Sequence, residues 1–207
     1  MCSGLTAFSA LKKVQRHPGI VNAKDVLVLG LGGLGFQGLG FALPMLGGPC
    51  LAADIDESKL KAAQKYGVTT FNSLDKDVVK QIKAASFDGT GIGAVVDFVG
   101  NAATYALGNA VLRKGGKQVI VGLFGGDMAT PLGVLQFPLQ ARSLEGSFVG
   151  SYEEAKEMMD VLRQGKTTVV PHHFQSIHTV NQSLLDLKAG KIIGRRIFKH
   201  DWPGSKA

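Results

Sequence analysis

The chain has 207 residues, a length that corresponds to one or two domains and is sufficient to bury a sizeable core. Hydrophobic residues make up 45% and charged residues 19% of the chain, values close to the globular average, so wholesale disorder is excluded. The formal net charge is +7, but the lysines and arginines are scattered in runs no longer than two residues, which argues against a nucleic-acid partner.

The first elements alternate between strand and helix. A short apolar helix is expected at residues 5–14, and the run Val26–Leu29 predicts a fully buried strand that is followed at once by glycine. From Gly33 to Leu46 the apolar residues recur with helical spacing. The alternation continues through strands at 51–54, 68–71, 94–97, 118–121 and 143–149 and helices at 57–66, 76–85 and 102–112.

Six mostly apolar strands separated by helices or long connections predict a parallel sheet that is covered on both faces. The expected fold class is therefore α/β, a doubly wound domain with a six-stranded Rossmann sheet. A capping box at Ser151 and Glu154 opens a further helix. Its apolar stripe is expected to be core and consists of Ala155, Met158, Met159 and Leu162. A smaller element follows, with a β-like stretch at 168–179, a helix at 180–189 and a strand at 192–198.

The strongest motif is the sequence Gly30-Leu31-Gly32-Gly33-Leu34-Gly35, which fits G-x-G-x-x-G between a predicted strand and a predicted helix. In this pattern the first glycine permits the tight turn, the second lets the backbone approach a pyrophosphate, and the third allows close packing of helix and strand. The helix N-terminus adds free N–H groups and its positive dipole end. The motif therefore predicts dinucleotide binding.

Asp54 stands at the end of the second predicted strand, 19 residues beyond Gly35. A carboxylate there accepts hydrogen bonds from the adenosine ribose and repels a 2′-phosphate, so NAD is the expected cofactor. The alternative is that Asp54 only caps the next helix, although Asp56 is better placed for that role. Lys59 is interpreted either as a contact to the ribose or pyrophosphate or as a solvated surface lysine.

Cysteines and histidines carry weaker signals. Cys2 and Cys50 cannot by themselves form a disulfide framework or a tetrahedral zinc site, and each is expected to be a reduced, buried thiol. His172 and His173 lie with His178 in a β-like stretch where neighbours face opposite sides, so no metal cluster is predicted. The chain lacks about 18 consecutive apolar residues and a signal-peptide pattern, so a cytoplasmic protein without membrane contact is expected.

Together with further segments, these residues resemble the zinc-dependent medium-chain alcohol dehydrogenases (the medium-chain dehydrogenase/reductase superfamily). The resemblance runs in order from Cys2 to about Phe198. It is carried by residues 2–8 (CSGLTAF), the glycine motif, residues 53–56 (ADID), residues 120–122 (IVG) and residues 146–150 (GSFVG). The combination of motifs is specific to that superfamily, although no single motif is.

The resemblance implies roles for individual residues. Cys2 matches one of three protein ligands of the catalytic zinc, which leave a fourth position open for alcohol or water. Thr6 matches a catalytic-site residue that touches the nicotinamide. The other matches are to cofactor contacts, namely the turn at Phe98 and Val99, the backbone of Val121, Gly122, Leu123 and Val149 near the carboxamide, and Arg195 at the pyrophosphate.

The chain departs from the family at its start. Family members begin with a catalytic domain of about 150 residues, a typical domain size, that supplies the other zinc ligands, and no such segment precedes Cys2. A truncated form is therefore expected, with residues 1–20 as a junction, 21–165 as the NAD-binding domain and 166–207 as a C-terminal segment of the catalytic domain. Residues 168–207 are expected to expose apolar surface.

The expected function of the complete protein is zinc-assisted hydride transfer between an alcohol or aldehyde and NAD, with the chain alone expected to be inactive. Two alternatives stay open: an NAD-binding module without turnover, and a zinc-free quinone oxidoreductase relative, against which Cys2 argues. In the family the sixth strand pairs with that of another subunit, and its polar alternation here favours a homodimer. The sequence does not identify the alcohol.

Overall fold

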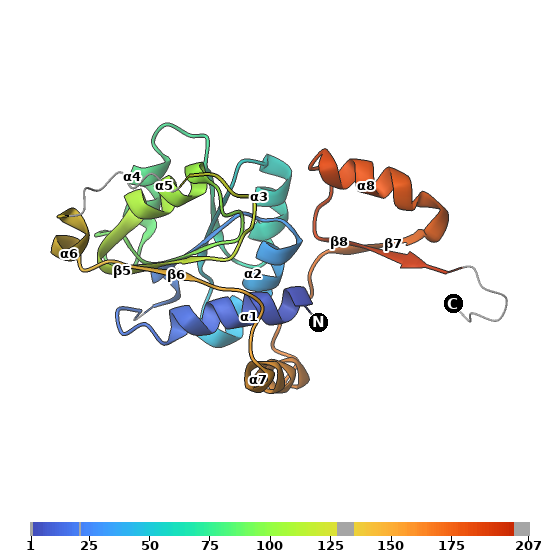
Figure 1. Cartoon of the computed structure of the whole chain (residues 1–207), viewed down its shortest axis with the longest axis horizontal. Helices are drawn as coiled ribbons and strands as arrows, with labels where there is room; N and C mark the ends of the chain where they lie inside the picture. The colour runs from blue at the N-terminus through green and yellow to red at the C-terminus, as the bar shows by residue number, and fades with distance from the viewer. Residues whose placement is uncertain (1, 21, 128–134, 201–207) are drawn as a thin grey trace.

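A computed structural model describes residues 2–20, 22–127 and 135–200 of the chain. Its main body is a six-stranded sheet with the order β3-β2-β1-β4-β5-β6, flanked by helices on both faces (Figure 1). All neighbouring strands run parallel. The predicted doubly wound α/β fold is therefore confirmed. Because the strand order reverses between β1 and β4, the sheet opens at their carboxyl ends, where such folds bind ligands.

The bounds of most elements agree with the periodicity of the sequence. The strands of the sheet are β1 (Val26–Leu29), β2 (Leu51–Asp54), β3 (Thr69–Asn72), β4 (Ile92–Asp97), β5 (Leu112–Ile120) and β6 (Ser143–Gly146). The helices around it are α1 (Cys2–Gln15), α2 (Gly33–Leu46), α3 (Glu57–Gln64), α4 (Val78–Ala85), α5 (Ala102–Val111), α6 (Gln136–Gln140) and α7 (Tyr152–Arg163). A 3-10 turn, Ala23–Asp25, precedes β1.

Within the sheet, the two predicted strands that differ most from the structure are those at 118–121 and 143–149. β5 begins at Leu112 rather than at 118, because residues around Gly115 form an irregularity in its pairing with β4 instead of a loop before it. Gly115 has a φ of +72°, which a residue without a side chain adopts readily. β6 ends at Gly146 rather than at 149, and Val149 follows it with a φ of +52°.

The sheet separates two apolar layers. Alternate residues of β1 point to opposite faces, so Val26 and Val28 pack with α1, α2, α3 and α7, whereas Leu27 and Leu29 pack with α4 and α5. The predicted core stripe of α7 is only partly correct, since Met158 is buried but Met159 and Leu162 are exposed. α7 packs against α1, and the two exposed side chains border a cavity of about 310 Å³.

A second, smaller unit follows α7. It consists of β7 (His172–Ser176), a 3-10 turn (Ile177–Thr179), α8 (Val180–Lys188) and β8 (Arg195–Lys199), with β7 and β8 paired in parallel (Figure 1). Its apolar side chains are largely exposed, as the sequence predicts for this segment: Phe174, Leu184, Leu185, Leu187 and Ile197. Residues 201–207 of that prediction lie outside the described residues. Within the described ranges, no helix has the length and apolar character needed to cross a membrane.

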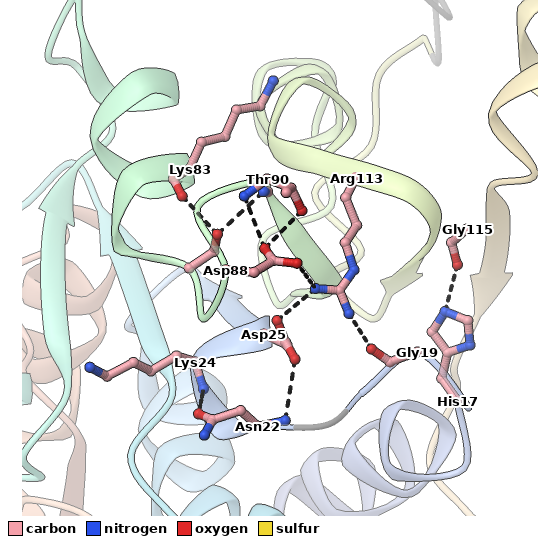
Figure 2. Close-up of polar contacts among 12 residues, drawn as sticks. His17, Gly19, Asn22, Lys24, Asp25, Lys83, Asp88, Thr90, Arg113 and Gly115 are labelled. Atoms are coloured by element: carbon pink, nitrogen blue, oxygen red, sulfur yellow. Dashed lines mark hydrogen bonds and ion pairs between the residues drawn. The ribbon is translucent and has the colours of Figure 1, made fainter.

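At the amino end of the sheet, Arg113 joins segments that are distant in sequence (Figure 2). Its guanidinium lies 2.8 Å from the fully buried carboxylate of Asp25 and 3.7 Å from that of Asp88, and it donates to the carbonyl of Gly19. Nearby, the His17 ring lies 2.8 Å from the carbonyl of Gly115. These contacts tie the connection between α1 and β1 to the start of β5.

Replacing Arg113 by Met is expected to lower the free energy of unfolding by about 3 kcal/mol, because it leaves a buried carboxylate without its cation. Urea denaturation measures the change. Lys114→Met removes an exposed positive charge at the next position and is the matched control, with an expected change within about 0.5 kcal/mol. Equal denaturation midpoints for the two variants would contradict a stabilising role of the buried pair.

Candidate functional site

The glycine motif forms the connection between β1 and α2, at the carboxyl end of the sheet. Gly30 leaves the strand with a φ of +87°, and its N–H donates to the carbonyl of Ala53 at 2.9 Å. A Cβ on Gly35 would lie 1.8 Å from the carbonyl oxygen of Gly30, and a Cβ on Gly30 would lie 2.4 Å from Val99. Both positions therefore require glycine for reasons of space.

The space in front of the α2 N-terminus is open. A Cβ on Gly32 would meet no atom within 4 Å, and Gly32 caps the helix without any side chain. The first intrahelical hydrogen bond runs from the N–H of Phe36 to the carbonyl of Gly32, so the N–H groups before it have no partner inside the helix. The side chain of Leu31 is buried, whereas Leu34 packs partly against the core.

Arg195, the first residue of β8, reaches this helix end from the smaller unit. A Cβ on Gly33 would lie 2.6 Å from Nε of Arg195, so the guanidinium lies directly against the first turn of α2. The positive helix end and the cation thus converge on one open space, an arrangement that suits an anionic group such as a phosphate.

Asp54 links the glycine turn to the next helix. Its Oδ2 accepts a hydrogen bond from the N–H of Leu31 at 2.5 Å, and its Oδ1 accepts one from the N–H of Asp56 at 2.9 Å. Each carboxylate oxygen has a further lone pair, so the half-buried group can still accept hydrogen bonds from a ligand. Asp56, not Asp54, caps α3 by accepting from the N–H of Ser58.

Lys59 lies in the first turn of α3, one turn beyond Asp54. Its Nζ is 3.5 Å from Oδ2 of Asp56, and the Lys59 side chain is 15% exposed. The interpretation as a freely solvated lysine is therefore wrong. The amine is instead held beside Asp56, close to the carboxyl end of β2.

A cavity of about 180 Å³ lies between the carboxyl ends of β1, β2 and β4 and the start of α5. Its lining is mostly apolar and contains a few polar groups. Its lining includes Gly30, Asp54, Ile55, Val99, Asn101 and Thr104. Asp54 thus borders this cavity and also holds the N–H of Leu31, the residue before Gly32.

Asp97 holds the turn after β4 in place by hydrogen bonds, a role that the sequence analysis did not predict. It ends β4 fully buried, and its carboxylate accepts hydrogen bonds from the N–H groups of Val99 and Gly100 at 2.9 Å and from the hydroxyl of Thr104 at 2.7 Å. Burial raises the pKa of Asp97, although these hydrogen bonds oppose the shift. The sequence signal for this role is an acidic residue at the end of an apolar strand, followed three residues later by a glycine.

The carbonyl of Asp97 joins the turn after β4 to the turn after β5. It accepts hydrogen bonds from the N–H groups of Val121 at 2.9 Å and Gly122 at 3.1 Å. A Cβ on Gly122 would lie 2.0 Å from the backbone of Val99, so the two turns are in direct contact. The Leu123 side chain is exposed beyond them.

The ring of Phe98 points to α2, because a Cβ on Gly38 would lie 2.7 Å from that ring. Its side chain therefore packs the turn against the helix, and a contact of Phe98 with a cofactor would have to come from its backbone. Val149 follows β6, and a Cβ on the adjacent Gly150 would lie 3.0 Å from Leu5. The segment after β6 is thus held beside the start of α1.

The start of α1 carries Cys2 and Thr6. Thr6 is buried, and its hydroxyl donates to the carbonyl of Cys2 at 2.8 Å. The prediction of a buried thiol is wrong for Cys2, which is exposed at the first turn of the helix, but it is correct for Cys50. The described residues contain no group of three or more His, Cys, Asp or Glu side chains that could hold a metal ion.

Comparisons with known proteins agree on one family. A family profile described as zinc-binding dehydrogenase matches residues 33–164. An NAD-dependent alcohol dehydrogenase of Sulfolobus acidocaldarius is 30% identical over 200 residues, which are 96% of this chain and 56% of that protein. An alcohol dehydrogenase of Geobacillus stearothermophilus is also 30% identical over 200 residues, with the same coverage.

A solved structure gives the same result. The alcohol dehydrogenase of the archaeon Aeropyrum pernix superposes with a TM-score of 0.81 at 30% identity, and the match covers 95% of this chain and 55% of that one. The chain therefore spans about half the length of the relatives that it matches.

The two thiols are expected to differ in reactivity. Burial raises the pKa of Cys50 to about 12, so at about pH 8 it holds its proton and is shielded, and only a thiolate is nucleophilic. A disulfide reagent should titrate one thiol in the native chain and both after denaturation. Cys2→Ser should abolish the native reaction and Cys50→Ala should leave it intact. Two equivalents from the native chain would contradict the assignment.

Proposed function

The chain belongs to the family of zinc-binding dehydrogenases, and from this premise we propose that it is the NAD-binding portion of an alcohol dehydrogenase. The observation that carries the proposal is the convergence of the open glycine turn, Arg195 and Asp54 on one end of the sheet. A dinucleotide needs an anion site beside a ribose acceptor, and this arrangement offers both. The names of the relatives give no support to the zinc-free quinone oxidoreductase alternative.

Each part of NAD has residues that suit it. The backbone around Gly32 and Gly33, with Arg195, would hold the pyrophosphate, and Asp54 the adenosine ribose, with Lys59 nearby. The cavity of about 180 Å³ next to Asp54 suits the adenine ring. On the nicotinamide side we propose the remaining predicted contacts: Thr6, Phe98, Val99, Val121, Gly122, Leu123 and Val149.

When bound, NAD supplies the acceptor for a hydride from the alcohol carbon. The residues of this chain bind and orient the cofactor: Asp54 and Arg195 fix its polar groups, and Asp97 holds the two turns that follow β4 and β5. Positioning of this kind lowers the barrier by fixing the reacting groups in advance.

The described residues alone do not fit a zinc site. Cys2 is exposed and suits one ligand position, but the described part of the chain brings no group of metal-ligating side chains together. The zinc implied by the family would need ligands from outside the described residues. We propose that this chain alone binds NAD without turning over an alcohol.

We also propose that a second copy pairs with β6, the edge strand of the sheet. The N–H of Ser147 donates to β5, so by the period of two the N–H of Leu144 points outward. An outward N–H row on an edge strand is available to another strand.

Gly32→Ala tests the NAD site. The added methyl meets no atom of the fold, so unfolding free energy should change by less than about 1 kcal/mol, whereas NAD affinity should fall about tenfold or more because the methyl occupies the space of the phosphate. Calorimetry measures the affinity. Gly146→Ala, also in open space but distant from the motif, is the control. Absence of NAD binding by the unaltered chain would overturn the proposed function.

Leu144→Pro tests the homodimer. Proline removes an outward N–H that β5 does not use, and edge strands tolerate it there, so the fold should persist while the mass by light scattering falls from dimer to monomer at micromolar concentration. Leu144→Val keeps the N–H and should stay dimeric. A monomeric mass for the unaltered chain would contradict the proposed pairing.

A further inference from the structure

The first turn of α3 carries a second carboxylate beside the ribose acceptor. The backbone N–H of Asp56 donates to Oδ1 of Asp54 at 2.9 Å, which fixes the two residues against each other. The Asp56 carboxylate in turn lies 3.5 Å from Nζ of Lys59. Only 15% of the Lys59 side chain is exposed, so most of it packs on the protein while its amine lies beside Asp56.

Lys59 has the chemistry that a 2′-phosphate would need. A cation near the ribose acceptor is what lets a dinucleotide site accommodate the additional phosphate of NADP, and Asp54 by itself repels that phosphate. The N-terminus of α3 adds a positive dipole end in the same place. The turn therefore holds two features that attract a phosphate, and Asp56 opposes both by its charge.

We propose that Asp56 is a second specificity-determining residue, which restricts the site to nucleotides without a 2′-phosphate by pairing with Lys59. The proposal rests on the proposed NAD function and deepens it. Discrimination then depends on two carboxylates: Asp54 excludes the phosphate directly, and Asp56 withholds the cation that would compensate for it. Hydrogen bonds from the Ser58 side chain and backbone, together with Lys59, lower the pKa of Asp56, so it stays charged at neutral pH.

The charge of Asp56 can be removed without removing its structural role. As the cap of α3, its Oδ1 accepts from the N–H of Ser58 at 2.9 Å, and asparagine caps helices as well as aspartate does. Its contact to Asp54 comes from the backbone and does not depend on the side chain. Asp56→Asn therefore preserves the turn and releases Lys59.

The test compares two adenosine probes, 5′-AMP and 2′,5′-ADP, by calorimetry at low salt on the unaltered chain, Asp56→Asn, Lys59→Met and the double variant. Asp56→Asn should bind 2′,5′-ADP about five- to tenfold more tightly, with 5′-AMP changed less than about twofold. The gain should vanish in the Asp56→Asn/Lys59→Met double variant, because the released amine produces it.

Glu57→Gln is the matched control. Glu57 is the adjacent carboxylate and accepts from the Asn72 side chain at 2.5 Å, so its loss removes the same charge without releasing Lys59. An equal gain in this variant, a gain that survives Lys59→Met, or no gain in Asp56→Asn would each overturn the specificity proposal. If the unaltered chain binds 5′-AMP and NAD in these cases, the proposed function stands, whereas binding of neither would remove both.

Discussion

The candidate site depends on the direct contact between the first turn of α2 and the end of β1. Position 35 of the helix faces the carbonyl oxygen of Gly30 so closely that a Cβ would lie 1.8 Å from it. This approach sets the angle at which α2 leaves the sheet, and thereby the direction of its free N–H groups. Asp54 secures the same turn from the next strand through the N–H of Leu31. An open helix end that suits an anion results from packing, before any charged side chain contributes.

Arg195 adds its charge to that packed turn from the far end of the chain. It begins β8 in a unit whose apolar side chains are mostly exposed and whose two-stranded sheet is small. Two-stranded sheets are marginal on their own in water, so the position of this unit relative to the main sheet determines whether the guanidinium reaches Gly33. The guanidinium of Arg195 and the N-terminus of α2 therefore lie together only while the smaller unit keeps its position against the main sheet.

The sequence was sufficient to predict what depends on local pattern. β1, α2 and β2 have the predicted bounds because dense apolar runs are separated by glycines whose role is local. Prediction was wrong around Gly115: the residues between the helix predicted at 102–112 and the strand predicted at 118–121 were expected to lie outside both, and they instead form an irregularity within β5. The prediction of the apolar stripe on α7 was also incomplete, because Met159 is exposed. Helical periodicity identifies such a stripe without showing how much of it the neighbouring helix covers.

Polar pairs between residues distant in sequence could not be predicted, because the sequence around one partner does not identify the other. The pair of Arg113 with Asp25 joins a residue of β5 to the 3-10 turn before β1, and only the folding of the sheet brings them together. The pairing of Lys59 with Asp56 likewise depends on side-chain direction, which the spacing leaves open. The motif therefore predicted where a dinucleotide would bind, and the structure was needed for the polar contacts that shape the site.

Asp54 and Asp97 are similarly placed carboxylates with different roles at the carboxyl end of the sheet. Both end a strand, and both hold a following turn by accepting backbone N–H groups. Asp97 is fully buried and accepts three hydrogen bonds on its carboxylate, so it has no surface for a ligand and acts only on the position of the turns. Asp54 is half-buried and accepts two, which leaves capacity toward the cavity. Burial thus decides which of two similar carboxylates positions the backbone and which is available to bind.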